Sequence, residues 1–257
     1  MQKLTIIKVG GKVVEEHETL TSLLNDFAKL DGLKLLVHGG GRSATKVAEK
    51  LGIETIMVDG RRVTDRATLD VVTMVYGGLV NKHIVAGLQA KGINSLGVTG
   101  ADLNLILAKK RPVKEVDYGF VGDVVSVQTD VISKLIESGI VPVVAPLTHD
   151  GQGNMLNTNA DTMASSLAVA LAKNFEVTLA YCFEKPGVMT DQDDENSVIP
   201  SLTFDVFKQH QATGVINSGM IPKLDNGFDA IKAGVKRVII TNPQGIGATF
   251  STGTVLE

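Results

Sequence analysis

Short apolar runs alternate with stretches of helical periodicity along almost the whole chain. The runs that predict buried strands are Leu4–Ile7, Lys34–His38, Val141–Leu147, Val177–Cys182 and Val238–Ile240. Apolar residues at helical spacing predict helices over residues 20–30, 43–51, 65–91, 129–136, 160–171, 203–211 and 221–234, with Thr129 as a cap. This alternation is typical of a three-layer αβα sandwich, in which helices cover both faces of a mostly parallel sheet.

One segment breaks the alternation. Thr55–Val58 and Arg61–Thr64 flank Asp59-Gly60, and Asp-Gly between two short strands favours a hairpin with a type I′ turn. Successive residues of a strand point to opposite faces, so at most one of Arg61 and Arg62 faces a cleft. There a guanidinium would bind a carboxylate through two hydrogen bonds. The alternative is a solvated edge.

Glycines follow the first two strands, in Lys8-Val9-Gly10-Gly11 and His38-Gly39-Gly40-Gly41. Glycine lets backbone N–H groups approach an anion, and the start of the next helix adds partial positive charge. Neither loop is a Walker A motif or a Rossmann fingerprint. Two such loops at one sheet edge suggest phosphoryl transfer, with Lys8 adding a full charge, although turn geometry alone explains many Gly-Gly pairs.

The second loop also matches part of the oxyanion hole of lipase-type hydrolases. Those enzymes need a G-x-S-x-G nucleophile elbow, and this chain has none, because the nearest segment, 93–97, begins with Ile93. The hydrolase interpretation is therefore rejected.

Two later segments carry polar residues at helix starts. Asn157-Thr158-Asn159-Ala160-Asp161 has more polar residues than one helix cap needs. Lys223 follows Pro222 in a first helical turn, where a cation opposes the helix dipole. Capping and solvent exposure are the alternatives to a functional role.

Composition narrows the class of protein. The 257 residues suffice for one large α/β domain or two lobes that share a sheet, and with 44% hydrophobic and 4% aromatic residues the core must be aliphatic. A net charge of −3 without a basic block argues against a nucleic-acid partner. Cys182 is the only cysteine, and the five histidines show no metal-ligand spacing. No apolar run approaches ~18 residues, so we expect no membrane span and a cytoplasmic location.

Taken together, the chain resembles the amino acid kinase family. The segments that carry the resemblance occur in the family's order and are 8–11, 38–41, 60–64, 119–122 (Gly-Phe-Val-Gly), 157–161 and 219–223. The resemblance implies ATP-dependent phosphorylation of the γ-carboxylate of an N-acyl-glutamate in arginine biosynthesis, with Mg²⁺ carried by the nucleotide and no metal held by the protein. It also implies a homodimer, with an acyl-amino-acid and dimerisation lobe over residues 1–172 and a nucleotide lobe over residues 173–257.

The resemblance assigns roles residue by residue. Lys8 and Lys223 would flank the transferred phosphoryl group, and Asp161 would hold both lysines. The residues implied to bind the acyl-glutamate are Gly40, Gly41, Arg62, Asn157 and Asn159. Those implied to contact the nucleotide are Gly10, Gly11, Glu184, Lys185, Pro186, Gly187, Val188, Met189, Val215, Ile216 and Asn217.

Two features depart from the family pattern. Where the family has Asp-Val-x-Gly, this chain has Glu184-Lys185-Pro186-Gly187, which puts the nucleotide contacts of that loop in question. The first strand begins by Leu4, without the additional helix of arginine-inhibited members, so we expect an arginine-insensitive dimer. Two alternatives stay open: a kinase for another small acid, such as aspartate or carbamate, and a non-catalytic relative that keeps the fold.

Overall fold

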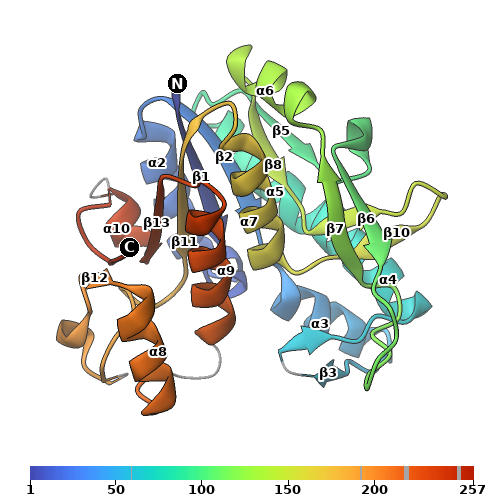
Figure 1. Ribbon diagram of the computed structural model, residues 1–257. Helices are drawn as coiled ribbons and strands as arrows, with labels where there is room; N and C mark the ends of the chain where they lie inside the picture. The colour runs from blue at the N-terminus through green and yellow to red at the C-terminus, as the bar shows by residue number, and fades with distance from the viewer. Residues whose placement is uncertain (59, 192, 217–219, 248–249) are drawn as a thin grey trace.

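The computed structural model describes residues 1–58, 60–191, 193–216, 220–247 and 250–257 (Figure 1). Within them, eight strands form a central sheet in the order β12-β14-β13-β11-β1-β2-β8-β5. In that order the strands are Ser201–Leu202, Thr254–Leu256, Arg237–Thr241, Glu176–Cys182, Lys3–Val9, Leu33–His38, Val141–Val144 and Ser95–Val98. From β13 to β5 all pairs are parallel, and β14 runs antiparallel to β13, so the prediction of a mostly parallel sheet is confirmed.

Two apolar cores lie on the two faces of this sheet, because neighbouring strand residues point in opposite directions. Ile6 packs in one core and Ile7 in the other, as do Leu179 and Ala180. Burial on both faces explains why these strands are continuous apolar runs.

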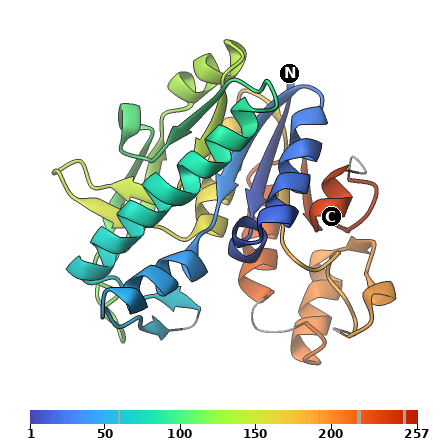
Figure 2. The same ribbon diagram turned by 180° about the vertical axis from the view of Figure 1, so that it is seen from behind.

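Helices close each core, as the sequence predicts. The first core is covered by α6 (Thr129–Glu137), α7 (Ala160–Leu171), α8 (Phe204–Ala212) and α9 (Ile221–Lys232). The second is covered by α1 (Gly11–Glu15), α2 (His17–Lys29), α3 (Gly41–Lys50), α4 (Arg66–Val72), η1 (Thr73–Val80), α5 (Asn81–Gln89) and α10 (Pro243–Gly247). Figure 1 looks onto α7 and α9, and Figure 2 shows α2 and the long helix of residues 66–89 on the reverse face.

The predicted long helix is one continuous stretch with an unpredicted π-helical centre. Asp65 caps it by accepting a hydrogen bond from the Thr68 amide, and η1 then joins α4 to α5. By length and composition alone, Arg66–Gln89 passes a test for a membrane-crossing helix, with a mean hydropathy of 1.3 over its best window. Core helices pass the same test, and this one contributes Leu69, Val72 and Ile84 to the second core.

A smaller sheet and a hairpin stand beside the central sheet. Four strands are ordered β10-β9-β6-β7, with bounds Met155–Asn157, Leu147–His149, Ile106–Lys110 and Gly122–Val127. The hairpin pairs β3 (Met57–Val58) with β4 (Arg61–Arg62), while Asp59 of its turn lies outside the described residues. Arg62 is buried and Arg61 exposed, as strand alternation predicts.

Some predicted boundaries are wrong. Thr129 is the first residue of α6 rather than its cap, which is Gln128, and that cap makes no side-chain hydrogen bond. The strand predicted over 141–147 ends at Val144, because the chain turns there and continues as β9 in the smaller sheet. The remaining short helices are 3₁₀ turns at Asp102–Asn104 and Glu195–Ser197.

The backbone of Thr64, just past the hairpin, is tied to the segment before β7. The Thr64 amide donates to the Tyr118 carbonyl at 2.9 Å, and the Phe120 amide donates to the Thr64 carbonyl at 2.7 Å. Gly119 lies between these bonds with φ of +70°, and a Cβ atom there would clash with the Thr64 carbonyl. This close approach fixes where the hairpin meets the rest of the lobe.

Gly119→Ala should therefore destabilise the protein more than Gly139→Ala. Gly139 also has a positive φ, of +82°, but open space around it. Its alanine variant should therefore lower the free energy of unfolding by about 1–2 kcal/mol, the cost of the left-handed conformation for a residue with a side chain. Gly119→Ala adds a steric cost of about 1–3 kcal/mol. Urea unfolding measures both variants, and equal losses would contradict the docking role of Gly119.

Candidate active site at the carboxyl edge of the sheet

Three loops meet at the carboxyl edge of the central sheet because their strands end in register. Val9 of β1 pairs with His38 of β2 on one side and with Cys182 of β11 on the other. The two glycine loops and the loop after β11 therefore leave the sheet at the same level. Parallel sheets bind ligands at this edge.

At two positions of the second glycine loop, Gly39 and Gly40, the packing is too close to admit a side chain. A Cβ atom on Gly39 would lie 3.0 Å from the Gly11 nitrogen, and one on Gly40 would lie 2.9 Å from the Tyr76 ring. The amides of Gly11, Gly40 and Gly41 donate no hydrogen bond to any residue that the structure describes. Open backbone N–H groups beside a helix start, here that of α3, are typical of anion sites.

A carboxylate joins two lysines that are far apart in the sequence. The Nζ atom of Lys8 lies 2.7 Å from Oδ1 of Asp161, and that of Lys223 lies 3.4 Å from Oδ2. Lys8 comes from β1, Asp161 from the first turn of α7, and Lys223 from the first turn of α9. Oδ1 is buried and accepts no well-aligned hydrogen bond from a described residue, so its contact with Lys8 is an ion pair.

The electrostatics of this cluster favour an incoming anion. Burial raises the pKa of the Asp161 carboxyl, but the charges of Lys8 and Lys223 together outweigh burial, so the pKa lies below its usual range. The carboxylate is therefore ionised at neutral pH. It balances one of the two formal positive charges and leaves the other for a ligand.

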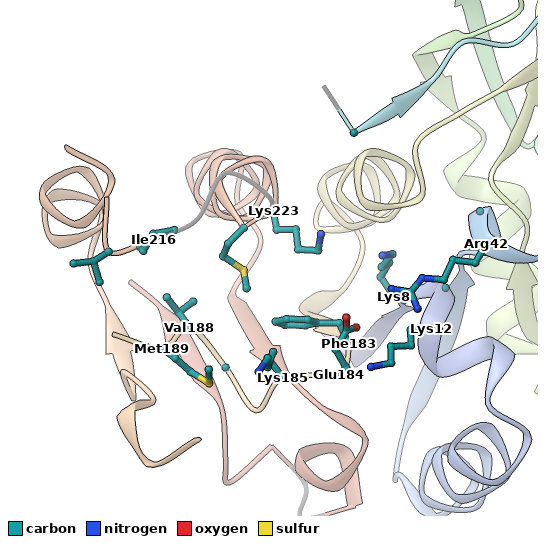
Figure 3. A pocket seen from close by; sticks show the side chains of 17 residues that line it. Lys8, Lys12, Arg42, Phe183, Glu184, Lys185, Val188, Met189, Ile216 and Lys223 are labelled. Carbon is teal, nitrogen blue, oxygen red and sulfur yellow. The ribbon is translucent and has the colours of Figure 1, made fainter. Parts of the chain in front are cut away.

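A cavity of about 710 Å³ opens beside the cluster (Figure 3). In the figure Lys223 reaches across it toward Lys8. The predicted nucleotide residues that line it are Gly10, Gly11, Glu184, Lys185, Gly187, Val188, Met189, Val215 and Ile216. Pro186 does not line this cavity, and Asn217 lies outside the described residues.

A second cavity, of about 220 Å³, adjoins the first. Lys8, Gly11 and Gly41 line both cavities. The residues predicted to bind the acyl-glutamate all line the smaller one: Gly40, Gly41, Arg62, Asn157 and Asn159. Because Asp161 also lines it, the cluster of Asp161, Lys8 and Lys223 stands at the junction of the two cavities.

Arg62 is a buried cation in the smaller cavity without a counter-ion among the described residues. Its guanidinium donates to the Gly41 carbonyl at 2.8 Å and to the hydroxyls of Thr45 at 2.8 Å and Thr55 at 3.1 Å. All three acceptors are neutral. A buried charge held only by neutral groups is costly, so a carboxylate bound in the cavity would complete this site.

The two asparagines differ in what they do. Oδ1 of Asn159 accepts hydrogen bonds from the amides of Asp161 and Thr162, at 2.9 and 3.0 Å, and so caps α7. The capping interpretation therefore holds for Asn159. Asn157 is not a cap: it ends β10, and its Nδ2 donates to the Thr64 hydroxyl at 3.0 Å.

Four lining residues with charged or polar side chains were not singled out from the sequence. Lys12 and Arg42 line the larger cavity, and Tyr76 and Arg111 line the smaller one. Each of Lys12 and Arg42 directly follows a glycine pair, a spacing that could have indicated them, and neither forms an ion pair with a described residue. Nothing in the local sequence marks Tyr76, because the π-helix decides where it points.

In the part of the chain that the structure describes, no group of three or more His, Cys, Asp or Glu side chains is arranged to bind a metal ion. Both oxygens of Asp161 already face lysines.

Residues 3–242 match the model of a known family, which is described as the amino acid kinase family. This chain belongs to the amino acid kinase family. Membership implies the use of ATP as the phosphoryl donor.

The chain is also similar to named relatives and to solved structures. It is 67% identical over 240 residues, 93% of either chain, to an acetylglutamate kinase of Bacteroides thetaiotaomicron. It is 63% identical to one of Phocaeicola vulgatus, covering 100% of this chain and 99% of that one. A solved Streptococcus mutans protein is 27% identical with a TM-score of 0.82, covering 98% of each chain. A Neisseria gonorrhoeae N-acetylglutamate synthase, at 22% identity and TM-score 0.81, shares the fold over 98% of this chain and 59% of its own.

Asp161→Asn is expected to lower the free energy of unfolding by about 3–5 kcal/mol at pH 7, because it leaves two ammonium groups without their shared carboxylate. The folded-state pKa of Asp161 is depressed, so its contribution is complete above the unfolded value of about 3.9 and is lost as the pH falls through the folded value. Urea unfolding at pH 7 and on acidification to pH 3 measures both effects.

A surface ion pair serves as the control for this variant. Lys208 and Asp225 are each 45% exposed, so Asp225→Asn should cost at most about 1 kcal/mol. A loss for Asp161→Asn no larger than the control's, or one that does not shrink on acidification, would contradict the assigned electrostatics.

Proposed function

We propose that this protein transfers the γ-phosphoryl group of ATP to the γ-carboxylate of N-acetyl-L-glutamate, in arginine biosynthesis. The observation that carries the proposal is the cluster of Lys8, Asp161 and Lys223 at the junction of the two cavities. Relatives named acetylglutamate kinase, 58–67% identical over 93% or more of the chain, support it.

The chemistry needs positioning and charge neutralisation more than proton transfer. A γ-carboxylate has a pKa near ~4.3, so it is an ionised nucleophile at neutral pH and needs no general base. Its oxygen forms the new bond to the γ-phosphorus while the bond to the β,γ-bridging oxygen breaks, and ADP leaves with that electron pair. The barrier lies in bringing an anion against a polyanion. Lys8 and Lys223 stabilise charge on the transferred group, and Asp161 holds both ammonium groups in place.

The smaller cavity is proposed to hold the acyl-glutamate. Arg62 would bind its α-carboxylate, which supplies the counter-ion that the buried guanidinium lacks. Asn157 lines the same cavity as Arg62, and the backbone N–H groups of Gly40 and Gly41 remain available to donate hydrogen bonds to the acyl-glutamate. This places the γ-carboxylate toward Lys8, which lines both cavities.

The larger cavity is proposed to hold the nucleotide. Lys12 and Arg42, at the starts of α1 and α3, would contact the polyphosphate. The residues that would contact the nucleoside are Glu184, Lys185, Gly187, Val188, Met189, Val215 and Ile216. Mg²⁺ bound to the ATP phosphates would neutralise part of their charge. Asp161 does not fit as its ligand, because both carboxylate oxygens are taken by lysines. We assign the nucleoside to the lobe of residues 173–257 and the acyl-glutamate to that of residues 1–172, with the polyphosphate between the two lobes.

A second candidate substrate is an N-succinyl-glutamate. Arg61 and Arg111 line the smaller cavity and also a neighbouring one of about 640 Å³. A longer acyl chain with a terminal carboxylate would reach a guanidinium there. Arg111 is already paired with Asp123, at 2.6 Å, so Arg61 would supply the unpaired charge.

Trapping the acyl phosphate with hydroxylamine tests the proposed function. The protein is incubated with ATP, Mg²⁺ and either N-acetylglutamate, N-succinylglutamate, glutamate, aspartate or carbamate. Hydroxamate is expected with an N-acyl-glutamate and not with aspartate, and ADP release is the readout for carbamate. Lys8→Ala and Lys223→Ala should each lower kcat by about 10²–10³-fold, the loss typical of one charge-stabilising donor.

The outcomes of this assay separate the alternatives. A signal with aspartate or carbamate alone would reassign the substrate, and no turnover with any acid would favour a non-catalytic relative. Asp225→Asn, at an exposed residue that lines neither cavity, is the control variant and should keep kcat. Retained kcat in either lysine variant would refute the role of that lysine.

We also propose a cytoplasmic homodimer that pairs through the N-terminal lobe. The long helix leaves Met74 and Leu79 exposed by 55% and 48% on its outer side, and a second copy would cover them. The single cysteine, Cys182, is buried and its burial raises the thiol pKa to about 12, so no disulfide is needed for the fold.

The dimer is tested by light scattering after size exclusion. The wild-type protein should have twice the chain mass of 27.2 kDa, and the double variant Met74→Glu, Leu79→Glu should have the single mass, because two buried charges would oppose pairing. Val113→Glu, at an exposed loop residue elsewhere, should stay dimeric. A wild-type monomer would exclude the proposal.

A further inference from the structure

A fully buried histidine lies directly beneath the second glycine loop. His38, the last residue of β2, is 0% exposed, and both of its ring nitrogens are engaged. Nδ1 lies 2.7 Å from the carbonyl oxygen of Gly39, and Nε2 lies 3.1 Å from Nδ2 of Asn81 on α5. No proton acceptor is left free on the ring, so His38 is not placed to act as a general base.

The neighbours of Asn81 decide which nitrogen of His38 carries the proton. Lys82 Nζ donates to Oδ1 of Asn81 at 3.1 Å and to the Gly97 carbonyl at 2.9 Å, which fixes Oδ1 as the acceptor end of the amide. Nδ2 of Asn81 must then donate, and it does so to the Val143 carbonyl at 2.9 Å and to Nε2 of His38. An imidazole that accepts at Nε2 carries its proton on Nδ1. Hydrogen bonds therefore run from Lys82 through Asn81 and His38 to the Gly39 carbonyl.

The charge state of the ring agrees with this direction. Burial lowers the pKa of His38 to about 4, with Lys82 acting in the same sense and the bond to Gly39 opposing it. The imidazole is therefore neutral at physiological pH, with one donor and one acceptor.

Holding the Gly39 carbonyl also orients the amide of Gly40. The two groups belong to one planar trans peptide, in which C=O and N–H point in opposite directions. With the carbonyl fixed on His38, the N–H of Gly40 is turned away from the core. Gly40 lines the smaller cavity, and its amide donates to no described residue.

The π-helical segment and the residue that follows it also pack against the second glycine loop. Tyr76 and Asn81 are five residues apart, which places them near one another along a helix with i to i+5 hydrogen bonds. Asn81 contacts His38, while the Tyr76 ring fills the space where Gly40 would carry a Cβ atom. π-helical turns occur frequently at functional sites, and here the wide turn lets two side chains of one helix support adjacent loop residues.

We propose that His38, oriented by Asn81, is a positioning residue that aims the Gly40 amide into the smaller cavity, at the carboxylate that receives the phosphoryl group. This role rests on the proposed function, because the ligand of that amide is the reacting group. His38 touches neither substrate: it acts only through the Gly39–Gly40 peptide.

A matched pair of variants separates this role from a structural one. In His38→Asn the side-chain amide replaces Nδ1, which keeps the bond to Gly39 and loses the one to Asn81. In His38→Gln it replaces Nε2, which keeps the bond to Asn81 and loses the one to Gly39. Each variant removes one buried hydrogen bond, so their melting temperatures should fall alike.

The kinetic results should differ between the two. His38→Gln is expected to lower kcat in the hydroxamate assay at least tenfold, with KM for ATP and for the acyl-glutamate changed by less than threefold. His38→Asn should keep kcat within threefold of the wild type. Equal kcat losses in both variants, or none in either, would overturn the proposal. Ile84→Ala, buried on the same helix as Asn81, controls for a core defect.

Nitrogen NMR of histidine-labelled protein tests the hydrogen-bond direction without any activity. The His38 signals, assigned by their loss in His38→Asn, should show a neutral ring protonated at Nδ1 that does not titrate between pH 5 and 8. A ring protonated at Nε2 would overturn the proposal even if both variants fold poorly. Absence of acyl phosphate from the wild type, with the Nδ1 form observed, would instead refute the proposed substrate and leave the hydrogen-bond chain standing.

Discussion

The ion pairs of Asp161 with Lys8 and Lys223 are the constraint on which the site depends. Two ammonium groups converge only if a carboxylate offsets their repulsion, and a buried carboxylate stays ionised only if cations surround it. The three residues come from β1, α7 and α9, which are widely separated in the sequence. Their convergence therefore links the proposed halves of the molecule and creates the surplus positive charge that a phosphoryl group needs.

Backbone N–H groups add hydrogen-bond donors to the positive charge of the two lysines. Parallel register ends β1, β2 and β11 at one level, so the glycine loops meet edge to edge and leave the amides of Gly11, Gly40 and Gly41 unpaired among the described residues. Fixed amides and fixed cations need little reorganisation when charge moves. Arg62 is likewise held in place in the smaller cavity, where its guanidinium donates to neutral partners and keeps its positive charge unbalanced.

The parts of the fold and of the site that depend on a local sequence pattern were predictable. Apolar runs ended by glycines predicted β1 and β2, the Asp-Gly pair predicted the hairpin, and strand alternation placed Arg62 inside and Arg61 outside. The prediction was wrong at Thr129, because a cap is defined by backbone geometry and not by residue type alone. The π-helix of Thr73–Val80 was missed, because its sequence is apolar in the manner of any buried helix.

The sequence by itself determined five strands of the central sheet, their mostly parallel arrangement, the main helices and the identity of the residues that carry charge, because these follow from spacing along the chain. The family resemblance implied that Asp161 holds both lysines, and the tertiary structure supplied the distances. Only the tertiary structure decided that Tyr76 packs against Gly40 and that His38 supports Gly40 through Gly39. These relations join residues that are adjacent in space but distant in sequence. They depend on register, packing and burial, which no local pattern encodes.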